Sequence, residues 1–142
     1  MGLLTKIKTL AEAAVPSYRF EYEAAKMQNV SADNGTFPLI FFEEYVNKDG
    51  AYLGRFGWRR RQSVELYFLR LAPLHADAVT REALREQIEA EAVLPFIEAV
   101  SGSGLFERVD DIRVTAVPPM FDSNAVGLLL SFDVVFPACS LV

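Results

Sequence analysis

The sequence has few of the residues on which enzymes most often rely. Its 142 residues include one cysteine, Cys139, and one histidine, His75. A single cysteine excludes a disulfide within the chain, so the cysteine content does not point to an oxidising compartment. A lone histidine between a strand and a helix is more often solvated than catalytic, and no serine or cysteine motif accompanies it. The sequence therefore offers no pairing of a nucleophile with a base.

Signatures of bound ligands are also missing. The acidic residues at Glu43, Asp110 and Asp133 have neither EF-hand nor zinc spacing. Gly54 and Gly57 do not open a helix, as the glycines of a phosphate-binding loop would. We therefore expect no metal ion, no cofactor and no catalytic residue.

Long apolar runs are absent. No stretch approaches the roughly 20 apolar residues that a membrane-spanning helix needs. Lys6 and Lys8 interrupt the apolar N-terminal segment, so no signal peptide is expected. The formal net charge of −5 argues against broad affinity for nucleic acid, which requires a basic surface. These absences predict a cytoplasmic protein with neither a membrane partner nor a specific nucleic-acid partner.

The chain is rich in apolar residues. Hydrophobic residues make up 51% of it and charged residues 23%. A chain of this length is expected to form a single domain over residues 1–142, with a core of its own. The apolar content is at the high end of the usual range, and a subunit interface would account for the surplus.

One long helix organises the predicted fold. Over Thr80–Val100 the apolar residues recur at helical spacing on one stripe, and we expect Leu84, Ile88 and Phe96 to be buried. The first residue of this range is the predicted N-cap. Pro95 lacks the N–H that would bond to the carbonyl four residues earlier, so the helix is expected to kink or break within a turn of it.

Strand patterns lie on both sides of this helix, and a shorter helix is predicted over Leu3–Val15. The shorter helix is expected to pack on its own sheet; docking on a membrane surface or a partner is the alternative. Turn-forming residues are expected to interrupt the chain at Asn47–Gly50 and Pro118–Pro119. A helix running on to Met27 competes with the first strand. The predicted strands are Tyr18–Glu23, Phe37–Val46, Gln62–Leu71, Asp111–Val117 and Val126–Phe136.

The element order is therefore α-β-β-β-α-β-β. This order predicts an α+β domain with a mainly antiparallel sheet of about four to five strands and two helices packed on one face. The last two strands are adjacent in the sequence, so we expect them to form an antiparallel hairpin.

The most unusual segment lies just before the strand at Gln62. Its glycines suggest bulges in a projecting β-arm or, alternatively, a flexible loop. Arginine among aromatic residues suits a protein interface, contacts to phosphate or single-stranded nucleic acid, or an edge strand that charge protects from aggregation. We expect Lys48–Arg61 to contact another subunit or a partner. Its candidate interface residues are Arg55, Phe56, Trp58, Arg59, Arg60 and Arg61.

The order of segments resembles the tail terminator and tail-completion proteins of long-tailed bacteriophages. The likeness covers most of the chain. It includes an aromatic strand at Tyr18–Tyr22, a strand opening with Phe37–Ile40, a helix with Phe96–Ile97 near its end and a closing hairpin with Gly127. Pro95 and the arginine-rich segment depart from the pattern.

The resemblance implies a non-enzymatic structural protein of a virion or prophage. Such proteins typically form a ring, often a hexamer, that caps the tail tube and joins it to the head connector. The partners would be other copies of the chain, the tail tube protein and the head–tail connector protein, first in the host cytoplasm and then in the virion tail. Two alternatives stay open: a small-ligand-binding or enzymatic α+β domain, and another head–tail neck adaptor.

Overall fold

The fold is described by a computed structural model that covers residues 2–22, 37–43, 48–54, 57–73, 75–120 and 125–137. For residues 48–54, 57–58, 118–120 and 137 it describes the backbone alone. The elements in chain order are α1 (Leu3–Ala14), β1 (Arg19–Glu21), β2 (Leu39–Phe42), β3 (Lys48–Gly54), β4 (Gly57–Leu71), α3 (Ala78–Ile88), η3 (Glu89–Val93), α4 (Leu94–Gly102), β5 (Arg108–Met120) and β6 (Ala125–Pro137).

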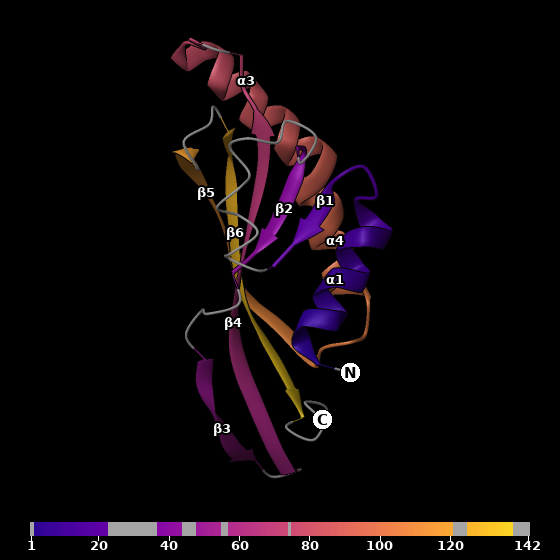
Figure 1. Ribbon diagram of the computed structural model, residues 1–142. Coiled ribbons are helices and arrows are strands. Elements are labelled where there is room, and N and C mark those ends of the chain that lie inside the picture. Colours follow the sequence, from indigo (N-terminus) through magenta and orange to yellow (C-terminus); the bar gives the residue numbers. More distant parts are fainter. Residues whose placement is uncertain are drawn as a thin grey trace.

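All the described strands belong to one sheet with the order β1-β2-β4-β6-β5, while β3 pairs with the N-terminal part of β4. The β1–β2 pair is parallel and the other pairs are antiparallel. Helix α1 and the long helix made of α3, η3 and α4 lie on the same side of the sheet (Figure 1). The predicted α+β class, the mainly antiparallel sheet and the helices on one face are confirmed, and β3 adds a strand to the predicted set.

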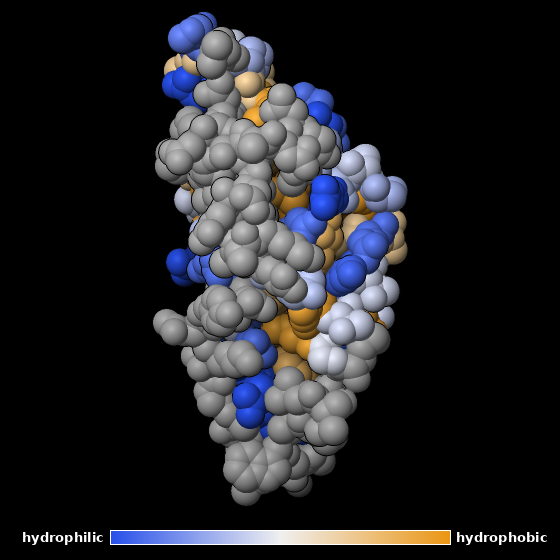
Figure 2. Space-filling view, viewed as in Figure 1, coloured by the Kyte–Doolittle hydropathy of each residue, from blue (hydrophilic) through white to orange (hydrophobic). Residues whose placement is uncertain are grey.

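The main core lies between the helices and the sheet. Phe68, Leu130 and Phe96 are fully buried there, together with Ile88, and Leu84 packs against them with partial exposure. A second, smaller apolar cluster that includes Leu69 lies outside this core. Alternation along β4 directs Leu69 to the other face of the sheet from Phe68. Figure 2 shows apolar side chains in a strip along the middle of the molecule, bordered by hydrophilic side chains.

Helix α1 packs on its own sheet through Leu3, Ile7 and Ala11, as predicted. Lys6 of this helix is also buried, although its side chain is charged. Its ammonium group lies 5.2 Å from the ring centroid of Phe136, a distance at which a cation is attracted to the face of an aromatic ring. The aromatic neighbours therefore allow a lysine to border the core.

The long helix begins earlier than predicted. Its N-cap is Asp77, and the predicted cap, Thr80, lies inside the helix. One carboxylate oxygen of Asp77 accepts a hydrogen bond of 2.8 Å from the backbone N–H of Thr80. Asp satisfies an N-terminal donor as well as Thr does, so composition alone did not decide between them. Within the described residues, no helix is long and apolar enough to cross a membrane.

Pro95 does not break the helix. Instead of a break, the residues just before it form the π turn η3, in which the N–H of Leu94 donates to the carbonyl of Glu89. Apolar residues spaced by four drift by about 40° per step around a regular α-helix. A wider turn reduces this drift and keeps Ile88, Val93 and Phe96 all facing the core.

The strands run further than predicted. Strand β4 begins at Gly57, and Lys48–Gly50, predicted as part of a turn, belongs to β3. The sequence did not indicate these extensions because the arm lacks an alternating apolar pattern. Its strands are held by the backbone hydrogen bonds between β3 and β4. Strand β5 continues through Pro118–Pro119, where a break was predicted, with a register shift between Val117 and Met120. Proline is tolerated there because the outer side of an edge strand needs no ladder donors.

Other predictions are confirmed where the chain is described. Strands β5 and β6 form the antiparallel hairpin. Strand β2 lies within the predicted strand Phe37–Val46, and the structure shows it buried on both faces. The alternative helix to Met27 and the end of the strand predicted to Val46 lie outside the described residues.

Gly127 provides a test of the fold. A Cβ atom at this position would lie 1.8 Å from the carbonyl oxygen of Phe68, so any side chain would force β6 away from β4. We expect Gly127→Ala to lower the free energy of unfolding by about 1–3 kcal/mol or more, measured by urea denaturation. Gly102→Ala is the matched control, because a Cβ there meets nothing within 4 Å. Equal stability of the two variants would contradict the close approach.

Candidate functional site

The arginine-rich segment lies at the base of a β-arm formed by β3 and the N-terminal part of β4. Of the predicted interface residues, Arg55 and Phe56 lie outside the described residues, and Trp58 is described by its backbone alone. Arg59, Arg60 and Arg61 follow in β4, where they pair with the C-terminal end of β6. Alternation along the strand sends Arg59 and Arg61 to the face of the sheet on which none of the described helices lies, called here the helix-free face, and Arg60 to the helix face.

Two of these arginines bind carboxylates of the same chain. The Nε atom of Arg59 lies 2.6 Å from a carboxylate oxygen of Glu107. One terminal nitrogen of Arg61 lies 2.6 Å from Asp133 and 2.9 Å from Asp111, and its other terminal nitrogen lies 3.5 Å from Asp110. These contacts tie β4 to β6 and β5 at the point where the arm leaves the body. The hydrogen bond to Asp133 raises the pKa of the Arg61 guanidinium above its ordinary value.

A bulge in β5 brings Asp111 to this cluster. The register shifts between Asp110 and Arg113, so that two residues of β5 lie opposite Phe132. Asp111 adopts the left-handed conformation, with a φ of 54°. Aspartate tolerates this region better than most residues, and the bulge turns an additional carboxylate toward Arg61.

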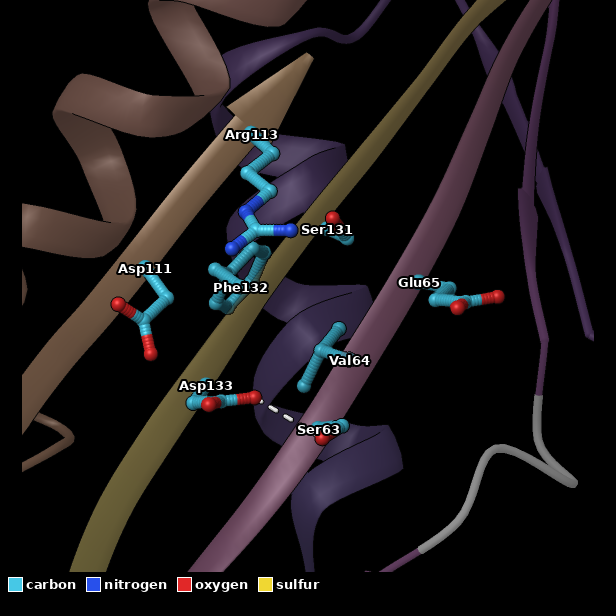
Figure 3. Close-up of a pocket in the computed structure, with 8 residues that line it drawn as sticks. All are labelled: Ser63, Val64, Glu65, Asp111, Arg113, Ser131, Phe132 and Asp133. Carbon is cyan, nitrogen blue, oxygen red and sulfur yellow. Dashed lines mark hydrogen bonds between the residues drawn. The ribbon is translucent and has the colours of Figure 1, made fainter. Parts of the chain in front are cut away.

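Beside the cluster, an open depression of about 290 Å³ lies over β4, β5 and β6 on the helix-free face (Figure 3). In it the hydroxyl of Ser63 donates a hydrogen bond of 2.9 Å to Asp133, and the Arg113 side chain extends toward Ser131. The depression therefore presents fixed charges of both signs, which suits contact with a polar surface. The residues lining it are Ser63, Val64, Glu65, Asp111, Arg113, Ser131, Phe132 and Asp133.

Arg60 differs from its neighbours. Its Nε atom is buried and has no hydrogen-bond partner within the part of the chain that is described. A buried N–H without a hydrogen-bond partner costs free energy of folding, and an acceptor that reached this nitrogen would remove that cost. Arg60 is therefore the arginine of the cluster whose bonding is least complete.

A second polar cluster joins the helix layer to the sheet. The Tyr18 hydroxyl donates a hydrogen bond of 2.6 Å to Glu91, which lies in the π turn η3, and the Arg70 Nε donates one of 2.5 Å to the same carboxylate oxygen. The Arg70 guanidinium also lies 5.6 Å from the centroid of the Tyr18 ring. Sequence analysis missed this cluster. The residues lie up to 73 positions apart, and no local pattern pairs them.

The surroundings set the protonation of this cluster. Burial, reinforced by the hydrogen bond to Glu91, raises the pKa of the Tyr18 hydroxyl well above its ordinary value. Burial alone would raise the pKa of Glu91, but the hydrogen bonds from Tyr18, Arg70 and Gln87 outweigh it and lower that pKa. At neutral pH the cluster therefore holds a neutral phenol, a carboxylate and a guanidinium, which suits a structural lock.

Of the residues considered for catalysis and metal binding, Asp110 and Asp133 belong to the Arg61 cluster, whereas His75 belongs to neither cluster. His75 is exposed in the connection before α3, with a φ of 62°, and it does not line the depression. Cys139 lies outside the described residues. No group of three or more potential ligands that could hold a metal ion is found in the described part of the chain.

The hydrogen bonds from Tyr18 and Arg70 to Glu91 in the π turn predict that stability depends on pH. The pKa of Glu91 is lower in the folded protein than its ordinary value of 4.5. The stability that depends on its charge is therefore present above about pH 4.5 and is lost as the pH falls through the lower folded-state pKa. We expect Glu91→Gln to lower the free energy of unfolding by about 1–2 kcal/mol near neutral pH and by less at about pH 3.5, measured by urea denaturation.

Glu89→Gln is the matched control, because Glu89 lies in the same turn and is exposed. Glu89→Gln should leave the free energy of unfolding unchanged at both pH values. A loss in Glu91→Gln that does not change with pH would contradict the ionic lock.

Comparison with known proteins adds no homologue to this description. A scan against models of known protein families finds no match, and a search of curated proteins finds no similar sequence.

Proposed function

We propose that the protein is a non-enzymatic structural subunit of phage or prophage tail assembly that works by forming a ring. The observation that carries the proposal is the β-arm. Strand β3 and the N-terminal part of β4 extend beyond both helices (Figure 1). A two-stranded ribbon gains little stability by itself, so an arm of this kind gains most by packing against another molecule.

The distribution of charge supports the same proposal. Residues 48–61 carry five basic side chains and one acidic side chain, a formal charge of +4, whereas the whole chain carries −5. The remainder of the chain therefore carries −9. Arg59 and Arg61 direct part of this positive charge to carboxylates of their own chain. The remaining excess of positive charge in the segment favours head-to-tail contact with the acidic remainder of another copy. Head-to-tail contacts form rings when the rotation between copies closes.

The proposed place of the ring in the tail follows from the resemblance to tail terminators. In this proposal the ring caps the tail tube and joins it to the head–tail connector, first in the host cytoplasm and then in the virion tail. Purified tail tubes incubated with the protein and viewed by electron microscopy would then carry a ring at one end. Tubes without such rings, together with binding to a head protein, would favour a neck adaptor instead. A monomer that binds a small molecule would favour the ligand-binding alternative.

Shortening the arm tests the proposed role. Ala51 and Arg60 lie opposite each other in the β3–β4 register. An Asn-Gly turn in place of residues 52–59 should therefore close a shorter hairpin. We expect the wild-type protein to elute as an oligomer and the arm-shortened variant as a monomer, by size-exclusion chromatography with light scattering.

Circular dichroism should show the same helix content in the arm-shortened variant, because both helices contact the sheet outside the arm. Val79→Lys is the control, since Val79 is 73% exposed at the start of α3, and it should keep the wild-type mass. A wild-type monomer at about 100 μM would refute the proposed self-association, because specific stable interfaces bind more tightly than this.

A further inference from the structure

We propose that the outer edge of β5 is the surface on which the arm of a neighbouring copy docks, as an added antiparallel strand. The inference rests on the proposed self-association and specifies its geometry. Each copy would offer its own β5 edge to one neighbour and its arm to the other.

The first observation is the state of β5 itself. Strand β5 ends the sheet, with β6 as its only strand partner among the described strands. It is 13 residues long, against a mean of about 5–6 for strands, and its residues 111–116 are all exposed. A long edge presents unpaired N–H and C=O groups that accept another strand. Strand β1, at the other end of the sheet, has three residues, too few to pair along β5.

The second observation is the apolar character of this edge. The register places Val114 opposite Leu130, on the helix side of the sheet, yet Val114 is 41% exposed and Leu130 is fully buried. Ile112, next to the helix-side groove against Phe96, is 42% exposed. The helices therefore cover β6 but cover the helix side of β5 only in part. A strand added at this edge would bury the exposed part of these two apolar side chains, which favours its addition.

The third observation identifies the occupant as a second copy. Strand β3 pairs with β4 and, among the described strands, with no other. Strands β3 and β6 both run antiparallel to β4, and β5 runs antiparallel to β6. Within one subunit β3 and β5 therefore run in opposite directions. Strand β3 lies level with β4 residues 57–62, whereas Val114 lies level with Leu66, so the axis that relates the copies must be inclined to the strands. A copy rotated about such an axis would bring its β3 antiparallel to β5, the more stable pairing.

Charge favours the same occupant. Residues 48–61 carry a formal charge of +4 and the rest of the chain −9, although Arg59 and Arg61 already bind carboxylates of their own chain. Beside the open edge of β5, Asp111 has a side chain that is 62% exposed although it contacts Arg61. The contact is heterologous, since an arm meets an edge, and its repetition around an axis gives a closed ring.

The test uses two variants that each lose one half of the contact. Ile112→Lys with Val114→Lys alters two exposed side chains on the edge, and the arm-shortened variant removes residues 52–54 of β3, the strand that would dock. We expect each variant alone to be monomeric, with the edge variant retaining the wild-type melting temperature. Val79→Lys, which alters an equally apolar exposed side chain on α3, should keep the wild-type mass.

Mixing the two variants gives the decisive result. The edge variant keeps an intact arm, and the arm-shortened variant keeps an intact edge, so one interface can still form. We expect a 1:1 complex at twice the monomer mass and nothing larger. If wild type is oligomeric but the edge variant keeps that mass, or if the mixture stays monomeric, this inference is wrong and the proposed ring survives. If wild type itself is monomeric, both are wrong.

Discussion

The pairing of β4 with β6 is the constraint on which the rest of the molecule depends. All 13 residues of β6 pair with β4, from Ala125 opposite Leu71 to Pro137 opposite Arg59. This ladder fixes which side chains face the helices, and so it positions the core. It also requires glycine at position 127, where the backbones of the two strands approach too closely for any side chain. The same ladder continues beyond the helices and becomes the base of the arm.

The helix layer adapts to this sheet through its π turn. The apolar stripe of the long helix steps by four residues, which would carry it off the sheet over several turns of regular α-helix. The π turn corrects the drift just before Pro95, where the lost N–H already weakens the regular pattern. Glu91, within that turn, is held by Tyr18 and Arg70, so one polar cluster fastens the helix, the sheet and the connection after α1 together. A local irregularity in the helix thus serves the global packing.

The helix-free face and the arm are organised by charge. Arg61 collects carboxylates from β5 and β6, and the bulge at Asp111 is what brings the second of them within reach. These ion pairs lie near the surface, where each contributes little to stability by itself. Their arrangement at the base of the arm fixes its direction more than it stabilises the fold. The proposed docking of the arm on β5 joins the most basic part of the chain to an edge that the helices cover only in part.

The sequence by itself determined the class of the fold, the two helices, the buried strands and the closing hairpin, because periodicity and turn residues act locally along the chain. It also singled out Lys48–Arg61 as unusual and allowed for a β-arm there, although it did not predict the extent of β3. Only the tertiary structure decided that Arg61 meets Asp133, that Tyr18 and Arg70 meet Glu91, and that β5 is covered only in part on its helix side. Those contacts join residues far apart in the chain. They depend on strand register and on how far the helices reach, which no local pattern specifies.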